Sequence, residues 1–284
     1  EQKVPEGLDY ELWTGPSPMK ALRRKSLHYD WHWDFDTGNG DVGNQGIHQM
    51  DLARWALGEA GLPKRTISVG GRLGYEDDGN TPNSQIVWHD YATAPLLFEV
   101  RGLPRDEAAQ KADWGKGMDD YLGARVGVIV HCERGTLRIP DYTRAIAYDE
   151  KGKEIRRFEG ATDHYANFVD AVRSRKVEDL RADVEQGHVS SALCHLGNVS
   201  HQLGAPSGTA DLAAAMERFA GANEAAGRLF EHLQKNGVDL TKDRLRLGAE
   251  LAIDAAKERF VGNDAANALL TREYRAGFEV PEQV

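Results

Sequence analysis

Seven short strand-like segments between residues 64 and 160 constrain the fold of this chain most strongly. They contain many β-branched and aromatic residues, which favour strands, and turn-forming residues separate several of them. Because consecutive strands follow one another without intervening helices, we expect an antiparallel sheet. The predicted strands are 66–69, 85–88, 96–100, 126–130, 136–139, 145–148 and 154–158.

Helical patterns flank this strand-rich region in the sequence. A helix is predicted from about Asn44 to Leu57, and Gly58 would end it. The predicted fold class is α+β, with an open, predominantly antiparallel sheet and helices packed on one face. The opposite face would then be free to pack, and we expect a homo-oligomer through it. Further helical segments, the last of them mixed with loop, are predicted over 163–175, 181–203, 211–235 and 254–274.

Composition and charge narrow the classes of partner. Residues 1–40 contain three prolines without long periodicity, so we expect an extended arm that leads into one domain over 41–284. The net charge of −10 argues against nucleic acid or an anionic membrane surface as a partner. No apolar run is long enough to span a membrane, and the cellular compartment stays open. The chain begins at Glu1 without an initiator methionine, so we expect a trimmed form of a longer protein.

Aromatic and ionisable residues are concentrated over 31–36. Trp31, His32, Trp33 and Asp36 are candidate sugar-binding residues, because aromatic faces pack on pyranose rings and carboxylates accept hydroxyl protons. The alternative is an arm whose tryptophans simply fill the core. The histidine and aspartate spacing matches no standard zinc pattern, so no metal site is predicted.

A polar stripe marks the predicted helix over 44–57. Asn44, His48, Asp51 and Trp55 would share one face of it. In the functional interpretation His48 handles a substrate proton, Asn44 hydrogen-bonds a hydroxyl and Asp51 contacts the substrate or orients the imidazole. In the structural alternative Asn44 caps the helix and His48 pairs with Asp51 inside the fold.

A second candidate histidine opens the segment 163–175. Asp163 is a plausible helix N-cap, and His164 in the first turn would point off the helix end toward a cleft, where it could contact substrate. The structural alternative is a partly exposed histidine in a capping turn.

No phosphate-binding fingerprint is found in the sequence. The segment 38–43 comes closest to a Gly-x-Gly-x-x-Gly turn, but no βαβ pattern surrounds it. We therefore expect no cofactor-binding residues in this chain, and it should not hold a dinucleotide by itself.

Several blocks together resemble the C-terminal, or substrate, domain of the Gfo/Idh/MocA oxidoreductases, most closely a branch abundant in planctomycete-like bacteria. The resemblance implies the open antiparallel sheet named above. It also implies an N-terminal Rossmann domain, absent from this chain, that carries the NAD or NADP site and a catalytic lysine. The blocks are 4–18, 38–58, 77–83, 164–168, 190–198 and 258–264.

By this resemblance His48 matches the family's catalytic histidine, whereas Asn44 stands where many members have an aspartate. The resemblance thus implies the substrate-binding and catalytic half of an NAD(P)-dependent oxidoreductase acting on a sugar, sugar derivative or cyclitol. This chain alone would be inactive in hydride transfer. Two alternatives stay open: a keto-sugar lyase, hydratase or NAD-dependent glycosidase of the same ancestry, and a stand-alone sugar-binding or assembly module.

Overall fold

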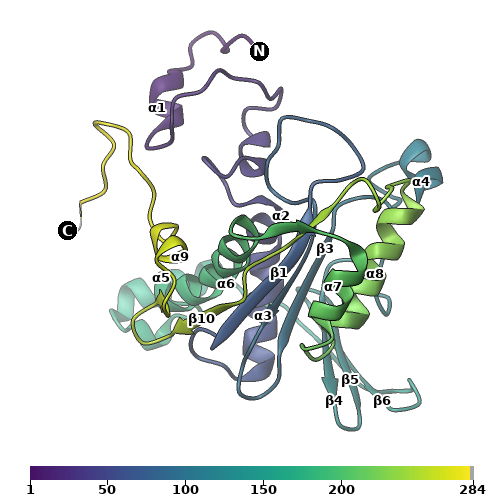
Figure 1. Ribbon diagram of the computed structural model, residues 1–284. Helices are drawn as coiled ribbons and strands as arrows, with labels where there is room; N and C mark the ends of the chain where they lie inside the picture. Colours follow the sequence, from purple (N-terminus) through teal and green to yellow (C-terminus); the bar gives the residue numbers. More distant parts are fainter. Residues whose placement is uncertain (282–284) are drawn as a thin grey trace.

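The computed structural model describes residues 1–281 and contains two antiparallel sheets (Figure 1). The larger, seven-stranded sheet has the order β11-β10-β1-β2-β3, and β9 pairs with both β1 and β8. Its central strands β1 and β2 pair along their length, from Thr66 opposite His89 to Gly71 opposite Ser84. The strands are β1 (Arg65–Gly71), β2 (Ser84–His89), β3 (Leu96–Arg101), β8 (Ala205–Ser207), β9 (Leu245–Leu247), β10 (Leu251–Asp254) and β11 (Arg259–Phe260).

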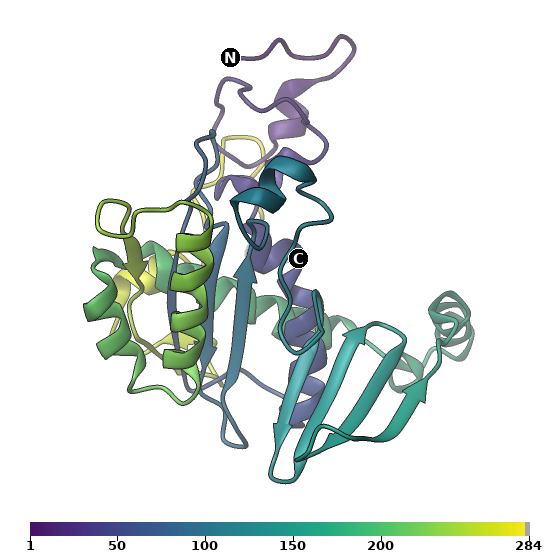
Figure 2. The ribbon, with the colours of Figure 1, turned by 90° about the vertical axis from the view of Figure 1, so that its right-hand side faces the viewer.

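The smaller, four-stranded sheet is a meander of consecutive strands. It stands apart from the larger sheet in Figure 2, and every residue of its outer strand β7 is exposed. The antiparallel pairing predicted from the short turns is confirmed here, since each strand pairs with the next one in the sequence. The strands are β4 (Val128–Cys132), β5 (Gly135–Asp141), β6 (Arg144–Asp149) and β7 (Glu154–Glu159).

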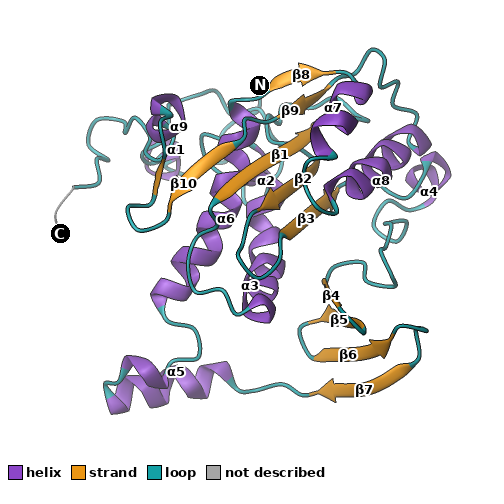
Figure 3. Ribbon diagram, turned by 60° about the horizontal axis from the view of Figure 1, so that its bottom comes forward, coloured by secondary structure: helices purple, strands orange, loops and turns teal. Residues whose placement is uncertain are grey.

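Helices cover the larger sheet on both faces (Figure 3). Short 3-10 turns η1 (Asp30–Trp33) and η2 (Val177–Asp179) complete the helical elements. The α-helices of the described chain are α1 (Tyr10–Thr14), α2 (Gly40–Asn44), α3 (Gly46–Leu57), α4 (Glu107–Ala112), α5 (His164–Ser174), α6 (Val184–Gln202), α7 (Thr209–Met216), α8 (Ala222–Lys235) and α9 (Asp264–Ala268).

The two faces of the larger sheet have separate apolar cores. Ile67 of β1 and its cross-strand partner Trp88 of β2 pack with α7 and α8. Val87 points to the other face and packs with α3 and α6. The α+β class with an open antiparallel sheet is confirmed, but the prediction of helices on one face only was wrong for this sheet. The reason is visible in β2, whose six residues are all buried, a pattern typical of a strand covered on both sides.

The predicted strands agree with the structure, whereas helix boundaries differ in two places. The predicted helix 211–235 is divided into α7 and α8, because Gly221 has φ +76° and starts a new helix. The helix predicted from Asn44 begins at Gly46 and ends at the left-handed Gly58, as expected. The sequence predicted one continuous helix over 211–235 because this alanine-rich stretch has strong helix propensity throughout.

The C-terminal tail contacts the N-terminal arm. The Arg275 backbone N–H donates to the Pro16 carbonyl at 3.1 Å, and the Arg275 Nη2 donates to the Glu11 carbonyl at 2.6 Å. The C-terminal tail after α9 therefore runs beside α1, as Figure 1 shows at the upper left. This contact brings residues far apart in sequence to the same end of the molecule.

Candidate functional site

The glycine-rich turn before α3 is filled by neighbouring protein atoms. A Cβ on Gly38 would meet the Cα of His32, and one on Gly40 would lie 2.7 Å from the Cβ of Thr81. Gly40 also has φ +67°, which residues with a side chain rarely adopt. The glycines thus allow the turn to pack against η1 and the segment before β2. They leave no open backbone cradle, so these residues do not fit the diphosphate of a dinucleotide.

The aromatic residues of η1 have different surroundings. His32 is 1% exposed, and its Nδ1 lies 2.6 Å from the Tyr29 carbonyl oxygen. Trp33 is half-buried and donates from its indole nitrogen to Asp41 at 3.3 Å. Trp31 is 41% exposed. Of these three candidate sugar-binding residues, the structure leaves only Trp31 well placed to meet a ligand, because His32 and Trp33 serve the core of the arm.

Asp41 is the carboxyl group that joins this aromatic cluster to α2. Burial raises the pKa of Asp41, although the Trp33 indole N–H and the neighbouring His32 and Arg72 favour its charged form. The His32 Nε2 lies 3.9 Å from the Asp41 Oδ1. These contacts fix the position of α2, and hence of the start of α3, relative to η1.

Two candidate substrate-binding carboxylates are bound to protein partners. Asp36 pairs with Lys20 of the arm. Asp51 accepts a 2.5 Å hydrogen bond from the Ser190 hydroxyl of α6, and its Oδ1 lies 3.5 Å from the Arg54 Nη2. These carboxylates therefore connect segments of the fold, and the expected pairing of Asp51 with His48 is replaced by its pairing with α6.

His48 lies in the first turn of α3 and is exposed. Its ring meets the ring of Tyr142 edge-on, with 5.5 Å between the centroids. Tyr142 lies in the turn between β5 and β6, and its hydroxyl accepts hydrogen bonds from the side-chain amides of Gln45 at 2.9 Å and Gln49 at 3.3 Å. We call these four residues the His48 cluster. It presents an imidazole, two amides and a phenol where the small sheet meets α3.

Asn44 lies beside this cluster but not on the same helix as His48. It is the last residue of α2 and is exposed, and Gln45 occupies the N-cap position of α3 without a side-chain capping bond. The prediction that Asn44 caps the helix was therefore wrong. A Cβ on Gly46 would lie 2.7 Å from the Phe98 ring, so the backbone changes helix where it passes close to β3.

His164 is not brought to the His48 cluster. Asp163 is the N-cap of α5, as predicted, and accepts from the Ala166 backbone N–H at 2.9 Å. The exposed His164 follows it, with its ring 4.1 Å from that of Tyr165. In Figure 2, α5 lies beyond β7, well away from α3. The structure therefore agrees with a histidine in an exposed capping turn.

Sequence patterns missed the tyrosine of the cluster. Tyr142 is 93 residues from Gln49 and 97 from Gln45, so helical periodicity could not relate them. The only local signal is the place of this aromatic residue between the predicted strands 136–139 and 145–148.

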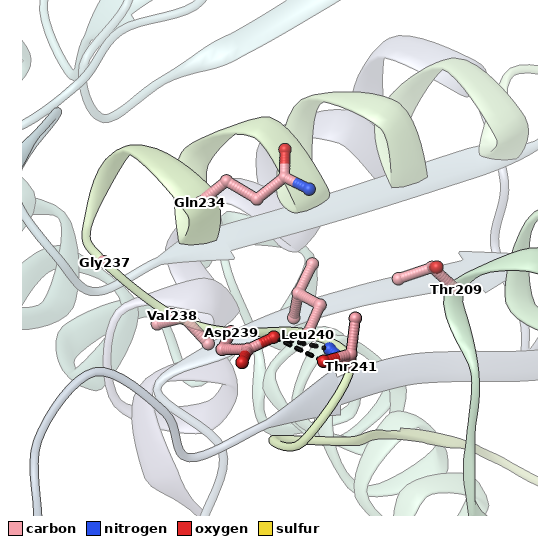
Figure 4. Close-up of a pocket in the computed structure, with 7 residues that line it drawn as sticks. All are labelled: Thr209, Gln234, Gly237, Val238, Asp239, Leu240 and Thr241. Atoms are coloured by element: carbon pink, nitrogen blue, oxygen red, sulfur yellow. Dashed lines mark hydrogen bonds between the residues drawn. The ribbon is translucent and has the colours of Figure 1, made fainter.

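A hollow of about 440 Å³ lies at a distant position, between the start of α7 and the loop after α8 (Figure 4). Its one acidic residue, Asp239, accepts from the Thr241 backbone N–H and hydroxyl at 3.1 and 2.6 Å. These bonds and Lys242 lower the pKa of Asp239 to about 2. The carboxylate therefore shapes its own loop, and none of the sequence candidates lines this hollow.

Among residues 1–281, no three His, Cys, Asp or Glu side chains gather in a group that could hold a metal ion. In the same part of the chain, no helix combines the length and apolar character needed to cross a bilayer.

The part of the chain that contains α3, the helix of the His48 cluster, matches a known protein family. Residues 1–86 match the model of an oxidoreductase family, described as the Gfo/Idh/MocA C-terminal alpha/beta domain. The predicted resemblance is confirmed over this segment, which contains three of its six blocks. No protein of curated function matches the sequence.

Solved oxidoreductase structures resemble the chain at low identity. The WlbA dehydrogenase from Bordetella pertussis, in complex with NADH and UDP-GlcNAcA, has 15% identity and a TM-score of 0.39, covering 62% of this chain and 47% of that one. An oxidoreductase from Thermotoga maritima has 12% identity and a TM-score of 0.40, covering 63% and 49%. The chain therefore spans about half the length of these proteins.

Proposed function

We propose that this chain is the substrate-binding half of an NAD(P)-dependent oxidoreductase that acts on a sugar, a sugar derivative or a cyclitol. The observation that carries the proposal is the His48 cluster, whose helix lies within the segment matched by the oxidoreductase family model. A polyol substrate suits this surface because the cluster offers several hydrogen-bonding groups and an imidazole, without a fixed carboxylate.

The roles follow from the chemistry of each side chain. A neutral imidazole on His48 accepts the proton of a substrate hydroxyl, the usual task of a general base. The amides of Gln45 and Gln49 already donate to Tyr142, and the Gln45 amide also donates to the Gln49 carbonyl oxygen at 3.1 Å. The Gln45 carbonyl oxygen and the phenol proton are therefore available for neighbouring substrate hydroxyls. Asn44 can hydrogen-bond the substrate but cannot take a proton. Trp31 is the remaining aromatic candidate for a sugar face.

The nucleotide would be held by a domain outside these residues. The packed glycine turn does not fit a diphosphate, and the family resemblance implies a Rossmann domain for that purpose. We therefore assign to this chain the binding of the substrate and the movement of its hydroxyl proton, and we assign no contact with the nicotinamide.

Asn44 favours one alternative, a lyase or hydratase acting on a keto sugar. Many family members have an aspartate at this position, and its replacement leaves His48 without an adjacent carboxylate from α2. An imidazole alone suffices to remove a proton next to a carbonyl group. This reaction would proceed without net reduction of added NAD or NADP.

The test uses the complete natural protein with a panel of sugars and cyclitols. We expect substrate-dependent reduction of NAD or NADP, and His48→Gln should lower kcat by roughly 100- to 10,000-fold, the usual contribution of a general base. His188→Gln is the matched control, since His188 is exposed on α6 and pairs with Glu258. Turnover that His48→Gln leaves intact, or sugar conversion with no need of a nucleotide, would overturn the proposal.

A further inference from the structure

A second hollow, of about 350 Å³, lies where the arm, η1 and the C-terminal tail meet. Its walls include Trp13 from α1, Trp31 from η1 and Arg272 from the tail. None of its lining residues belongs to the His48 cluster. The combination of two indoles and a guanidinium in one concave surface is chemically specific, and of its walls the proposed oxidoreductase function uses only Trp31.

The protein builds this hollow from three separate parts of the sequence. The Arg272 Nη1 donates to the Asp36 carbonyl at 2.5 Å, which ties the tail to the turn after η1. Arg275 donates from Nε to the Gly15 carbonyl at 3.0 Å, which ties the tail to the arm. Because these contacts are long-range and directed, the hollow has a fixed shape.

The aromatic walls are held in position. Tyr10 stacks on Trp13 with 5.5 Å between ring centroids and 13° between the planes, so only the opposite face of Trp13 is available to the hollow. The Trp31 indole N–H donates to the His28 carbonyl at 3.2 Å, which fixes a ring that is 41% exposed. Fixed indole faces suit the apolar C–H surface of a pyranose.

Three hydroxyl groups line the same hollow, and each donates its proton to a backbone carbonyl. The Thr14 and Thr37 oxygens can therefore accept the hydroxyl protons of a sugar, whereas the Ser17 oxygen already accepts from the Arg272 Nη1 at 3.5 Å. The bonds are Thr14 to the Tyr10 carbonyl at 2.8 Å, Ser17 to the Asp36 carbonyl at 2.5 Å and Thr37 to the Trp31 carbonyl at 2.7 Å.

Arg272 supplies an available positive charge. In the described part of the chain, no carboxylate lies within ion-pair distance of its guanidinium, although the whole chain has a net charge of −10. Its Nη1 is used by Asp36 and Ser17, whereas the edge formed by Nε and Nη2 has no protein partner among residues 1–281. Two parallel N–H groups on one edge match the two oxygens of a carboxylate.

We propose that this hollow binds a pyranose that carries a carboxylate, that is, a uronic acid unit. The indole faces of Trp13 and Trp31 contact the ring, the Thr14 and Thr37 hydroxyl oxygens accept from the sugar hydroxyls, and Arg272 binds the carboxylate through Nε and Nη2. This is a binding site and not a reaction site, so it stands independently of the proposed oxidoreductase activity.

Calorimetric titration of the chain with methyl glucuronoside, methyl glucoside and glucose 6-phosphate tests the assignment. The glucuronoside should bind with a stoichiometry of one, about 10- to 100-fold more tightly than the neutral glucoside, as expected for one hydrogen-bonded charge pair. Arg272→Gln should remove this difference while leaving the weak binding of the glucoside unchanged. Trp31→Leu should weaken both glycosides, and Arg156→Gln, which changes an exposed arginine of β7, should weaken neither.

Three outcomes would overturn the proposal. They are equal affinity for the charged and neutral glycosides, tighter binding of the phosphate than of the carboxylate, and an Arg272→Gln variant that loses both glycosides together. The last result would mean that Arg272 only holds the tail in place. His48→Gln should bind the glucuronoside as the natural sequence does, so failure here is distinguishable from failure of the proposed activity.

Discussion

A pair of glycines in α6 gives a sharp test of how this helix packs on the sheet. A Cβ on Gly197 would lie 2.7 and 2.8 Å from the two γ-methyl carbons of Val87 on β2. Val87 is fully buried, and its β-branched side chain has few alternative rotamers, so it cannot move away. Gly187 lies in the same helix with nothing within 4 Å of its Cβ position.

The two alanine substitutions should therefore change stability in opposite directions. Alanine in place of glycine within a helix stabilises by about 0.5–1 kcal/mol. Forcing an extra methyl group into a packed core costs about 1–3 kcal/mol. Gly187→Ala should thus raise the free energy of unfolding by about 0.5 kcal/mol, since the residue is near the helix start. Gly197→Ala should lower it by about 0.5–2 kcal/mol.

Thermal unfolding followed by circular dichroism measures both variants against the natural sequence. A change of 1 kcal/mol shifts Tm by roughly 2–4 °C in a domain of this size class. A Gly197→Ala variant that is as stable as the natural sequence, or more stable, would refute the contact between α6 and β2. It would also refute the packing of α3 and α6 on this face of the larger sheet.

Three further predictions concern other parts of the molecule. Burial lowers the pKa of four histidines, three of them to about 4 or below. The unfolded chain therefore binds their protons from about pH 6.5 downward while the folded chain does not, and Tm should fall as the pH drops from about 6.5 toward 4; a flat Tm over that range would contradict this. Arg54 is 1% exposed, and Arg54→Leu leaves Asp51 without its cation, so urea unfolding should show a loss of about 3 kcal/mol; a variant with native stability would show that the ion pair contributes nothing. We still expect a homo-oligomer, now through the exposed apolar residues of β7 and α5, and Phe168→Asp should lower the sedimentation coefficient; a monomeric natural chain would disprove it. The three histidines are His89, with a pKa lowered to about 3, and His201 and His232, with pKa values lowered to about 4, and the fourth is His195.

Helices cover both faces of the larger sheet, so the expected oligomer interface cannot be a free face of that sheet. We place it instead on the small sheet and α5. The exposed apolar side chains of the small sheet and its following helix include Ile155 at 64%, Phe158 at 46%, Tyr165 at 75% and Phe168 at 61% exposure. A surface of this kind is typical of a contact with another protein chain.

Much of the fold followed from local patterns in the sequence. All seven predicted strands are present, because short β-rich segments between turns leave few alternatives. The short strands β8 to β11 were missed, since two to four residues carry too little periodicity to recognise. The sequence did not predict that helices cover both faces of the larger sheet. The face on which each helix packs is set by long-range contacts and not by local patterns.

Only those features of the candidate site that depend on residues close together in the sequence could be predicted. His48 and its place in the first helical turn followed from the spacing of residues in one segment. The burial of His32 depends on Tyr29 and Asp41, and the engagement of Asp51 depends on Ser190, a partner 139 residues away in sequence. Long-range contacts of this kind cannot be recognised from a periodic pattern. Fewer of the candidate side chains are therefore available to a substrate than the sequence predicted.

The central claim is that His48 moves the proton of the substrate hydroxyl, and the pH dependence of kcat/KM tests it most directly. In the complete protein, kcat/KM of the natural sequence should fall along an acid limb of the profile, as is usual in general-base catalysis. His48→Gln should show a much lower kcat/KM without this acid limb, while His188→Gln should keep the natural profile. An acid limb that persists unchanged in His48→Gln would contradict the claim.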